Sequence, residues 1–469
     1  MNDVTKIGTS MTASIGANAI KALKVMLAAM LAFSISIGPT VAQGVPLVRD
    51  AEMEALIRDY SQPIFKAAGL KSNFVAIHLV RSNQFNAFVA NGRRMFINLG
   101  TLRQADTPNE VIGVIAHEAG HIAGGHLTRI RQAVSGARTI SIVSSILAGA
   151  AIVAGAAAGN TQAAQAGAGL LQGSSSIAGR TILAHQRTEE VAADRAAVSY
   201  LEKTGQSAVG MLKTFETLQR QIPITARSID PYVLSHPLPR ERIGLIENLV
   251  AKSKFRDKKD SKSLIARHKL MQAKISAFTE HPQRVGRRYP SKDKSLAADY
   301  ARAIVGYRFG KVKRAQKNID KLIKRAPNYP YFWELKGQAY LEGGQPQNAI
   351  APLRKALKLA PGQPLIQTLL GHALVATNDP KNNKEAISIL NKAISRDQTI
   401  ANAHTQLAIA HSRAGQTGLA SLATANGLFY FGDIRGSKFH ASRAKKKLKT
   451  GSRGWLQADD ILKYKNPRL

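Results

Sequence analysis

The sequence predicts a mainly α-helical chain, in which an α+β domain with a small sheet beside two helices is followed by an α-solenoid. One observation behind this prediction is the hairpin signal Asn91-Gly92, which lies between apolar runs shortly before a well-marked helix start. The other is a repeat of fixed period in the second half of the chain. With 469 residues, 44% of them hydrophobic, the chain is long enough for two or more domains and too apolar for wholesale disorder.

The N-terminal segment is typical of a cleaved export signal. Lys21 and Lys24 precede the run VMLAAMLAFSISIGPTVAQ, which is short for a membrane span and ends in small residues. We expect cleavage after Ala42, which makes residues 1–42 a signal peptide and the periplasm the expected location. An uncleaved anchor is the alternative. Cysteine is absent, and this excludes thiolate metal sites, disulfides and cysteine catalysis.

Residues 43–250 are expected to form the first domain. The stretch NFVAIHLVRSNQFNAFVANGRRMFINLGTL indicates strands around a turn at residues 90–92. A helix then begins with a proline at its first position, Pro108, and with Glu110 placed to complete a capping box. We expect this helix to run to about Arg131.

This helix carries the motif HEAGH. His117 and His121 lie one turn apart on the same face, a spacing at which two imidazoles bind one Zn²⁺. Glu118 lies about 100° round the helix, where it reaches water rather than the metal. In the H-E-x-x-H arrangement this glutamate is the general base of peptide hydrolysis. Two buried imidazoles without a metal would need other partners, so we predict one zinc ion per chain.

The third ligand is expected on the helix that begins near Thr188. Glu190 and Asp194 are four residues apart on one face, surrounded by alanines whose small side chains let two helices approach closely. A site of two histidines and Glu190 leaves a fourth position open for water, as catalytic zinc requires. Asp194 is placed to hydrogen-bond a ligand histidine. The competing interpretation makes Glu189 the ligand, or treats both acids as favourable charges in the first turn of a helix.

A third histidine follows the motif closely. His126 lies five residues after His121 and points away from the ligand face if the helix continues. The longer metzincin pattern requires histidine at the next position, which is Leu127 here. Gly124-Gly125 can end the helix, so the exclusion is not complete. We expect His126 to be a cap or surface histidine and not a ligand.

The stretch from residue 139 to residue 179 contains no charged side chain and is rich in Ala, Gly and Ser. As two membrane spans it is weak, because Asn, Gln and repeated Gly interrupt its second half. We expect either a hairpin of small-residue helices packed beside the site or a mobile amphipathic lid that touches membrane.

The second half of the chain repeats with a period of 34 residues, lengthened to 37 where DPKNNK extends one turn. In the best copy, the residues that match the tetratricopeptide pattern are Trp333, Gly337, Tyr340, Ala349, Ala356 and Pro361. The predicted helix pairs, which together cover 296–434, are 296–329, 330–363, 364–400 and 401–434. Such pairs stack into a solenoid whose concave face binds protein or peptide.

Most of the positive charge lies in this second half. The net charge is +36, and residues 251–469 carry 43 basic and 14 acidic side chains. We expect a basic connector at 251–295 and a basic C-terminal segment at 435–469. For an exported chain, this charge favours an anionic membrane or lipopolysaccharide surface over nucleic acid as a partner. A merely solvated basic surface is the alternative.

The pattern H-E-x-x-H followed by E-x-x-A-D is similar to that of the HtpX and CAAX-prenyl-protease family of zinc metallopeptidases. The export signal and the C-terminal repeats narrow this resemblance to the BepA-like periplasmic branch. The resemblance covers nearly the whole chain after the signal. It implies that His117, His121 and Glu190 are the zinc ligands, that Glu118 is the base and that Asp194 supports a ligand from behind.

Two further stretches match the family. They are Asn86-Ala87-Phe88 before the motif helix and HPLPRER, in which His236 and Arg242 are six residues apart. The resemblance implies that Asn86, His236 and Arg242 face the cleft, where they can donate hydrogen bonds to the developing oxyanion. In the BepA-like branch, a histidine at the place of His236 can instead cap the zinc and hold the enzyme latent. The sequence leaves both roles open.

The expected function is that of a periplasmic zinc endopeptidase whose repeats recruit unfolded or misassembled protein substrates. The resemblance implies quality control of outer-membrane proteins alongside the outer-membrane assembly machinery, together with a chaperone role. One alternative is a non-catalytic repeat-based adaptor with a structural metal site. Another is an inner-membrane-associated protease, in which residues 139–179 insert into the membrane.

Overall fold

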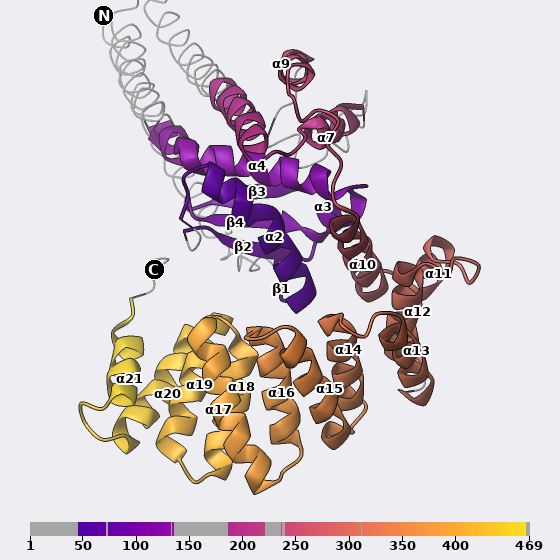
Figure 1. Cartoon of the computed structure of the whole chain (residues 1–469). Coiled ribbons are helices and arrows are strands. Elements are labelled where there is room, and N and C mark those ends of the chain that lie inside the picture. Colours follow the sequence, from indigo (N-terminus) through magenta and orange to yellow (C-terminus); the bar gives the residue numbers. More distant parts are fainter. Residues whose placement is uncertain are drawn as a thin grey trace, which may run out of the picture. The chain divides into compact units, whose positions relative to one another are not determined.

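The computed structural model describes residues 46–71, 74–132, 134–135, 186–220, 236, 240–310 and 312–465 (Figure 1). The expected signal peptide and the uncharged segment from 139 to 179 lie outside these residues. Helices predominate, and a four-stranded sheet is formed by the N-terminal part. The predicted fold class, mainly α-helical with a small sheet followed by helix pairs, is therefore confirmed.

The sheet has the strand order β1-β2-β4-β3. Its strands are β1 (Leu47–Val48), β2 (Ala76–Val80), β3 (Ala87–Ala90) and β4 (Arg94–Asn98). β3 and β4 form the predicted antiparallel hairpin, and Asn91 and Gly92 at its turn have φ angles of 53° and 67°. Asparagine and glycine are the residues that tolerate this left-handed backbone. Because β2 pairs with β4 in parallel, β3 is left at the edge of the sheet.

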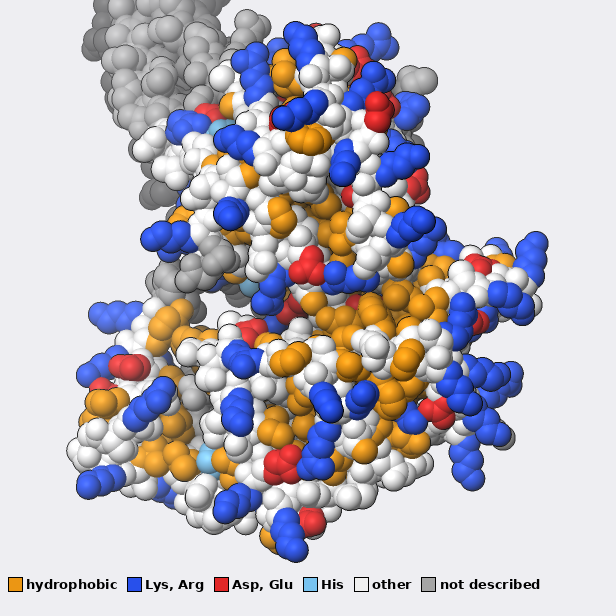
Figure 2. All heavy atoms as spheres, in the orientation of Figure 1, with side chains coloured by type: hydrophobic (Ala, Val, Ile, Leu, Met, Phe, Trp, Pro, Cys, Tyr) orange, Lys and Arg blue, Asp and Glu red, His pale blue; other side chains and the backbone are white. Residues whose placement is uncertain are grey.

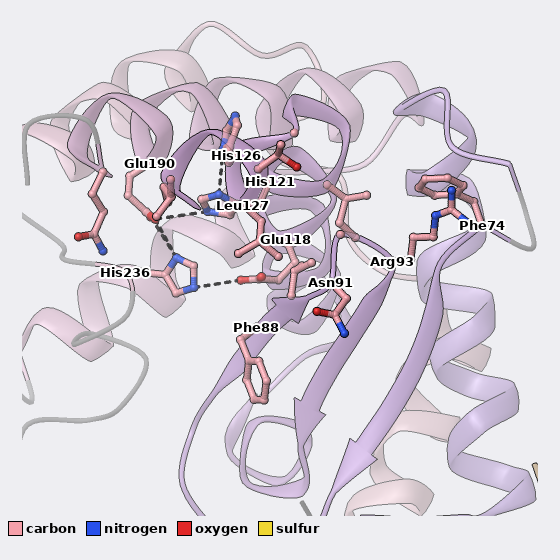
Figure 3. A pocket seen from close by; sticks show the side chains of 17 residues that line it. Phe74, Phe88, Asn91, Arg93, Glu118, His121, His126, Leu127, Glu190 and His236 are labelled. Atoms are coloured by element: carbon pink, nitrogen blue, oxygen red, sulfur yellow. Dashed lines mark hydrogen bonds and ion pairs between the residues drawn. The ribbon is translucent and has the colours of Figure 1, made fainter. Parts of the chain in front are cut away.

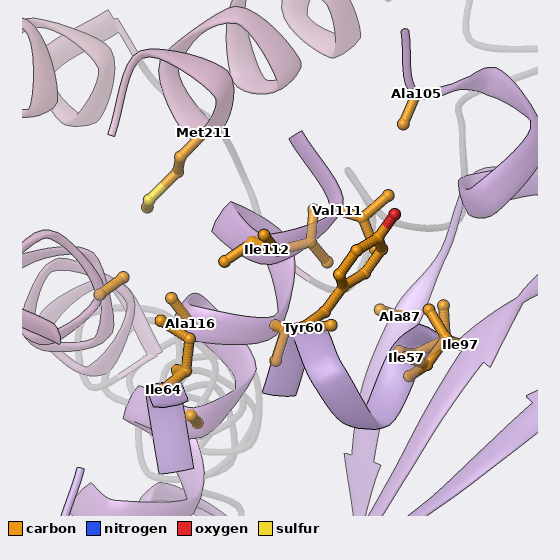
Figure 4. Close-up of a cluster of buried hydrophobic side chains, with 14 of the residues drawn as sticks. Ile57, Tyr60, Ile64, Ala87, Ile97, Ala105, Val111, Ile112, Ala116 and Met211 are labelled. Atoms are coloured by element: carbon orange, nitrogen blue, oxygen red, sulfur yellow. The ribbon is translucent and has the colours of Figure 1, made fainter. Parts of the chain in front are cut away.

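Several helices pack with this sheet around one core. In chain order, the helices of this part of the molecule are α2 (Ala51–Ala67), α3 (Leu99–Gln104), α4 (Pro108–Gly124), residues 186–203, α7 (Val209–Arg220) and α9 (Arg240–Ala251). Tyr60 of α2, Val111 of α4 and Ile97 of β4 belong to the same buried cluster as Met211 of α7 (Figure 4). Burial of each such side chain stabilises the fold by about 1.5–3 kcal/mol. This core fixes α4 against its neighbours.

Helix α4 begins where the sequence predicts. Pro108 lies in its first turn. Glu110 accepts hydrogen bonds from the backbone N–H of Asp106 at 3.0 Å and from the hydroxyl of Thr107 at 3.3 Å. In a capping box this glutamate would accept from the N–H of the cap residue, Thr107. Here it accepts instead from the N–H of Asp106, one residue earlier.

The same helix ends earlier than predicted. Gly125 has a φ of 67° and closes the helix after Gly124, because glycine adopts the left-handed conformation without steric cost. Helical turns resume only at 126–132. The expected continuous helix to Arg131 was wrong, and the break changes the direction in which the following side chains point.

The basic segment 251–295, expected as a connector, is largely helical. It contains α10 (Lys262–Thr279) and α11 (Pro282–Arg288). The Lys274 ammonium is buried and lies 2.7 Å from a carboxylate oxygen of Asp50 and 3.2 Å from one of Glu52. Lys274 is therefore not a solvated surface charge. It is a buried ion-pair partner of Asp50 and Glu52 at the start of α2.

Paired helices follow in the order that the repeat predicts. They are α12 (Leu296–Phe309), α13 (Val312–Arg325), α14 (Pro330–Glu342), α15 (Pro346–Leu359), α16 (Pro364–Ala376), α17 (Pro380–Arg396), α18 (Ala401–Arg413) and α19 (Thr417–Phe431). Gly337 of α14 allows close packing, since a Cβ atom there would lie 2.4 Å from the Leu353 side chain. A further pair, α20 (Ile434–Lys447) and α21 (Arg453–Lys463), occupies the segment expected only to be basic.

Lys and Arg side chains are spread over much of the visible face of the described residues, where they outnumber Asp and Glu (Figure 2). Helix α13 is among the contributors, with the basic residues Lys313, Arg314, Lys317, Lys321, Lys324 and Arg325. An anionic surface as partner stays a prediction. Within the part of the chain that the structure describes, no helix is both long enough and apolar enough to cross a membrane.

Candidate metal and catalytic site

Two helices approach closely at the site because small residues line their contact. A Cβ atom on Gly120 of α4 would lie 2.9 Å from the backbone oxygen of Ala193. Ala193 and Ala197, on the helix of residues 186–203, are fully buried. The alanines around Glu190 thus let the two helices approach closely, as predicted. This approach brings the carboxylate of the second helix next to the histidines of the first.

The structure groups four side chains that can bind a metal ion, which we call the donor cluster: His117, His121, Glu190 and His236. One ligand atom from each lies within 4.8 Å of the others. The Nε2 atoms of His117 and His121 are 3.1 Å apart, and each lies 3.4 Å from a carboxylate oxygen of Glu190. The histidines and the glutamate that the sequence singles out therefore converge on one place, and Figure 3 shows His121, Glu190 and His236 of this group.

His236 joins this group from a distant part of the sequence. Its Nδ1 lies 3.0 Å from Glu190 Oε1 and 3.4 Å from His117 Nε2. Its Nε2 lies 3.5 Å from Glu118 Oε1. Figure 3 shows the ring between the two glutamates. Of the two roles that the sequence leaves open for His236, this placement fits the capping role.

Glu118 has a buried carboxylate that accepts no hydrogen bond from the described residues. Its side chain is 1% exposed, and neither oxygen has a hydrogen-bond partner among the described residues. Burial raises the pKa of this carboxyl, against the opposing charges of His236 and His117. A buried carboxylate is costly unless something polar meets it. The site therefore fits a metal centre, in which a water molecule lies between such a carboxylate and the ion.

Asp194 and Arg242 lie behind the donor cluster. Asp194 Oδ1 is 3.0 Å from Nδ1 of His117, on the side of the ring that faces away from the cluster. Arg242 donates two hydrogen bonds to Asp194, of 2.7 and 2.9 Å, and its Nη1 is 2.9 Å from Glu190. Although burial opposes its charge, Asp194 has a lowered pKa because His117 and Arg242 stabilise the carboxylate. The guanidinium is thus occupied by two carboxylates.

Asn86, the other residue predicted to face the cleft, lies outside the donor cluster. The backbone N–H of Asn86 donates to the Thr101 hydroxyl, and its backbone carbonyl accepts from that hydroxyl and from the N–H of Asn98, at the start of the hairpin. Its Oδ1 is buried without a partner among the described residues. A cavity of about 510 Å³ lies over Glu118 and His121, and neither Asn86 nor Arg242 is among the residues that line it. Their predicted contact with a substrate carbonyl stays a prediction.

This cavity connects the donor cluster with the edge strand β3. Its lining includes the apolar side chains of Phe74, Phe88 and Leu127, with Arg93 and Asn91 at the hairpin end (Figure 3). The outer edge of β3 pairs with no other described strand. The arrangement places the outer edge of β3 along one side of the cavity and His121, Glu190 and His236 of the donor cluster in its lining.

His126 differs from the expected cap or surface histidine. It is 3% exposed and lies outside the donor cluster. Its ring contacts His121 on one side and Glu189 on the other. Glu189, the competing candidate for third ligand, pairs with Arg129 instead of joining the cluster. The only sequence signal for this arrangement is the Gly124-Gly125 pair, which allows the chain to turn back.

Comparison with known families agrees with this geometry. A model of peptidase family M48 matches residues 48–250, and a tetratricopeptide repeat model matches residues 300–364. The chain carries a peptidase family M48 domain followed by tetratricopeptide repeats. The M48 domain is a metallopeptidase domain, and it contains the whole donor cluster. The resemblance to the metallopeptidase family is thereby confirmed.

Several proteins resemble this chain over part of its length. The beta-barrel assembly-enhancing protease of Yersinia pestis is 24% identical over 319 residues, which cover 66% of this chain and 63% of that protein. The protein of the same name from Escherichia coli strain K12 is 22% identical over 322 residues, with the same coverage. A putative beta-barrel assembly-enhancing protease of Vibrio cholerae is 29% identical over 202 residues, 42% of this chain and 39% of that protein. The chain thus spans about 63% of the length of the first two relatives.

Proposed function

We propose that this chain is a zinc-dependent endopeptidase in which His117, His121 and Glu190 hold the metal ion. One observation carries the proposal: two imidazole nitrogens and a carboxylate converge beside Glu118, a buried carboxylate without a hydrogen-bond partner among the described residues. Two histidines and one glutamate are a known ligand set of catalytic zinc. The M48 domain supports metal-dependent hydrolysis.

The roles of the side chains follow from their positions. A zinc ion held by these ligands supplies Lewis acidity toward a peptide carbonyl and lowers the pKa of water. Glu118 takes a proton from the attacking water and passes it to the leaving amine. Asp194 holds the His117 ring with its Nε2 toward the cluster, and Arg242 holds the two carboxylates Asp194 and Glu190 in place.

The proposed substrate is an unfolded or misassembled protein in extended conformation. Such a segment can add to the edge of β3 as a further strand, and backbone hydrogen bonds of this kind need little sequence preference. The repeats, which stack helix pairs, are proposed to recruit the client. The names of the relatives point to outer-membrane protein assembly, and we propose that this chain serves the same process in the periplasm.

The proposal is tested by metal analysis of the purified full chain and by its action on an unfolded protein substrate. We expect about one zinc ion per chain, loss of cleavage with a chelator and recovery when Zn²⁺ is added back, because the ligands are built into the fold. Protein without bound zinc, or cleavage that persists in the chelator, would contradict the proposal.

One observation favours the alternative of a repeat-based adaptor with a structural metal site. His236 adds a fourth protein donor, and closed four-ligand sites are typical of structural zinc. The enzyme interpretation explains the same contact as a latent state. His236 would have to withdraw from the cluster before a substrate could enter. The two interpretations differ in what removal of this ring should do.

The His236→Ala variant is expected to cleave an unfolded substrate faster than the wild type. The gain would be about tenfold if roughly a tenth of wild-type molecules have the ring withdrawn at any time. Initial cleavage rates under identical zinc loading measure it. His281→Ala, at the exposed residue that precedes α11, is the control and should leave the rate unchanged. An unchanged or lower rate for His236→Ala would count against capping and would leave the oxyanion role.

A further inference from the structure

The two histidines on α4 differ in what lies behind them. His117 has the carboxylate of Asp194 behind its Nδ1, 3.0 Å away. Behind His121 the corresponding neighbour is a second imidazole: Nδ1 of His126 lies 2.9 Å from Nδ1 of His121. Figure 3 shows His126 on the far side of His121 from Glu118 and His236.

The second imidazole is itself held by an ion pair. Nε2 of His126 lies 2.9 Å from Glu189 Oε2. Arg129 donates hydrogen bonds of 2.6 Å to each oxygen of that carboxylate. His126 and Glu189 are 3% and 4% exposed, so water does not compete for these contacts. The series His121, His126, Glu189 and Arg129 is therefore a connected set of contacts that ends on a bidentate ion pair, in which the carboxylate is buried and the arginine is 46% exposed.

The proton positions along this series follow from the acceptor at its end. A carboxylate paired with arginine only accepts, so Nε2 of His126 carries a proton. Nδ1 of the neutral His126 ring then accepts, and the proton between the two rings belongs to Nδ1 of His121. That tautomer leaves the lone pair of His121 on Nε2, the atom that faces His117 and Glu190.

The backbone around the glycine pair makes this geometry accessible. The left-handed Gly125 turns the chain after α4, and His126 folds back over the last turn of the helix. A Cβ atom on Gly124 would lie 2.1 Å from Nε2 of the His126 ring. The ring thus occupies space that only glycine leaves open at this position.

We infer that His126 is a positioning residue for the metal site, through which the Glu189–Arg129 ion pair orients His121 and fixes its metal-binding tautomer. This inference rests on the proposed function, because it assigns His121 as a ligand. It gives each histidine of the motif its own arginine-held carboxylate: Asp194 with Arg242 directly behind His117, and Glu189 with Arg129 through His126.

The test is the zinc affinity of the purified full chain, measured by competition with a chromophoric chelator. We expect His126→Phe to weaken zinc binding by about 10- to 100-fold, the usual effect of losing an outer partner of a ligand. His126→Gln, whose amide can accept from His121 and donate to Glu189, should restore most of the affinity. Equal losses in both variants, or an affinity for His126→Phe within about twofold of the wild type, would overturn the inference.

A second pair of variants covers the case in which His126→Phe does not fold. Glu189→Met removes the acceptor at the end of the series without touching either ring, and it should also weaken zinc binding. Glu202→Met on the same helix, whose carboxylate contacts Ser253 away from the cluster, is the matched control and should bind zinc as the wild type does. Equal affinities of these two variants would overturn the inference. A wild-type chain that binds no zinc would instead contradict the proposed function.

Discussion

The Glu118→Gln variant is expected to lose peptide hydrolysis by about 10²- to 10⁴-fold, the range that general acid–base catalysis contributes. The amide fills the same space but cannot take a proton from water. Zinc content should stay the same, because Glu118 is adjacent to the ligands and is not assigned as one. Cleavage of an unfolded protein by zinc-loaded wild type and variant measures the effect.

The fold should not suffer from this change. In the wild type the carboxylate is 1% exposed and has no hydrogen-bond partner among the described residues, so its charge is a cost to the folded state. The neutral amide should leave the free energy of unfolding equal or higher. Glu110→Gln, two turns earlier on α4, is the matched control with wild-type cleavage. Equal cleavage by both variants would rule out Glu118 as the base.

Local rules predicted those parts of the site that depend on one helix at a time. His117 and His121 share a face because they are four residues apart, and Glu190 and Asp194 share one for the same reason. That the two faces meet was predictable from the alanines between them. The period of 34 residues predicted the helix pairs because each repeat buries its apolar face against the next.

Long-range contacts decided the rest. The parallel pairing of β2 with β4 has no local signal, since strand order depends on how the chain returns to the sheet. Lys274 belongs to a segment expected to be a basic connector, and Arg242 was expected to face the cleft, but each is buried against two carboxylates. The prediction for His126 assumed that the helix continues past Gly125, so that the ring points away from the ligand histidines. The left-handed conformation of Gly125 ends the helix, and the ring contacts His121 instead.

The second large effect is expected from Arg242→Met. This side chain is 1% exposed and contacts both Asp194 and Glu190, which are themselves buried. Methionine fills much of the same space but leaves two buried carboxylates without their cation. Removing one partner of a buried ion pair costs about 3–5 kcal/mol. We therefore expect the free energy of unfolding of the metal-free chain to fall by about this amount in guanidinium titrations.

Two comparisons separate this effect from a general loss of charge. Arg240→Met, two residues earlier and exposed on the same helix, should change the free energy of unfolding by no more than about 0.5 kcal/mol. Adding Asp194→Asn to Arg242→Met removes one of the two stranded charges, so the double variant should be more stable than Arg242→Met alone. If Arg242→Met unfolded at the same denaturant concentration as Arg240→Met, the guanidinium would not hold the carboxylates. The support proposed for His117 and Glu190 would then have to come from elsewhere.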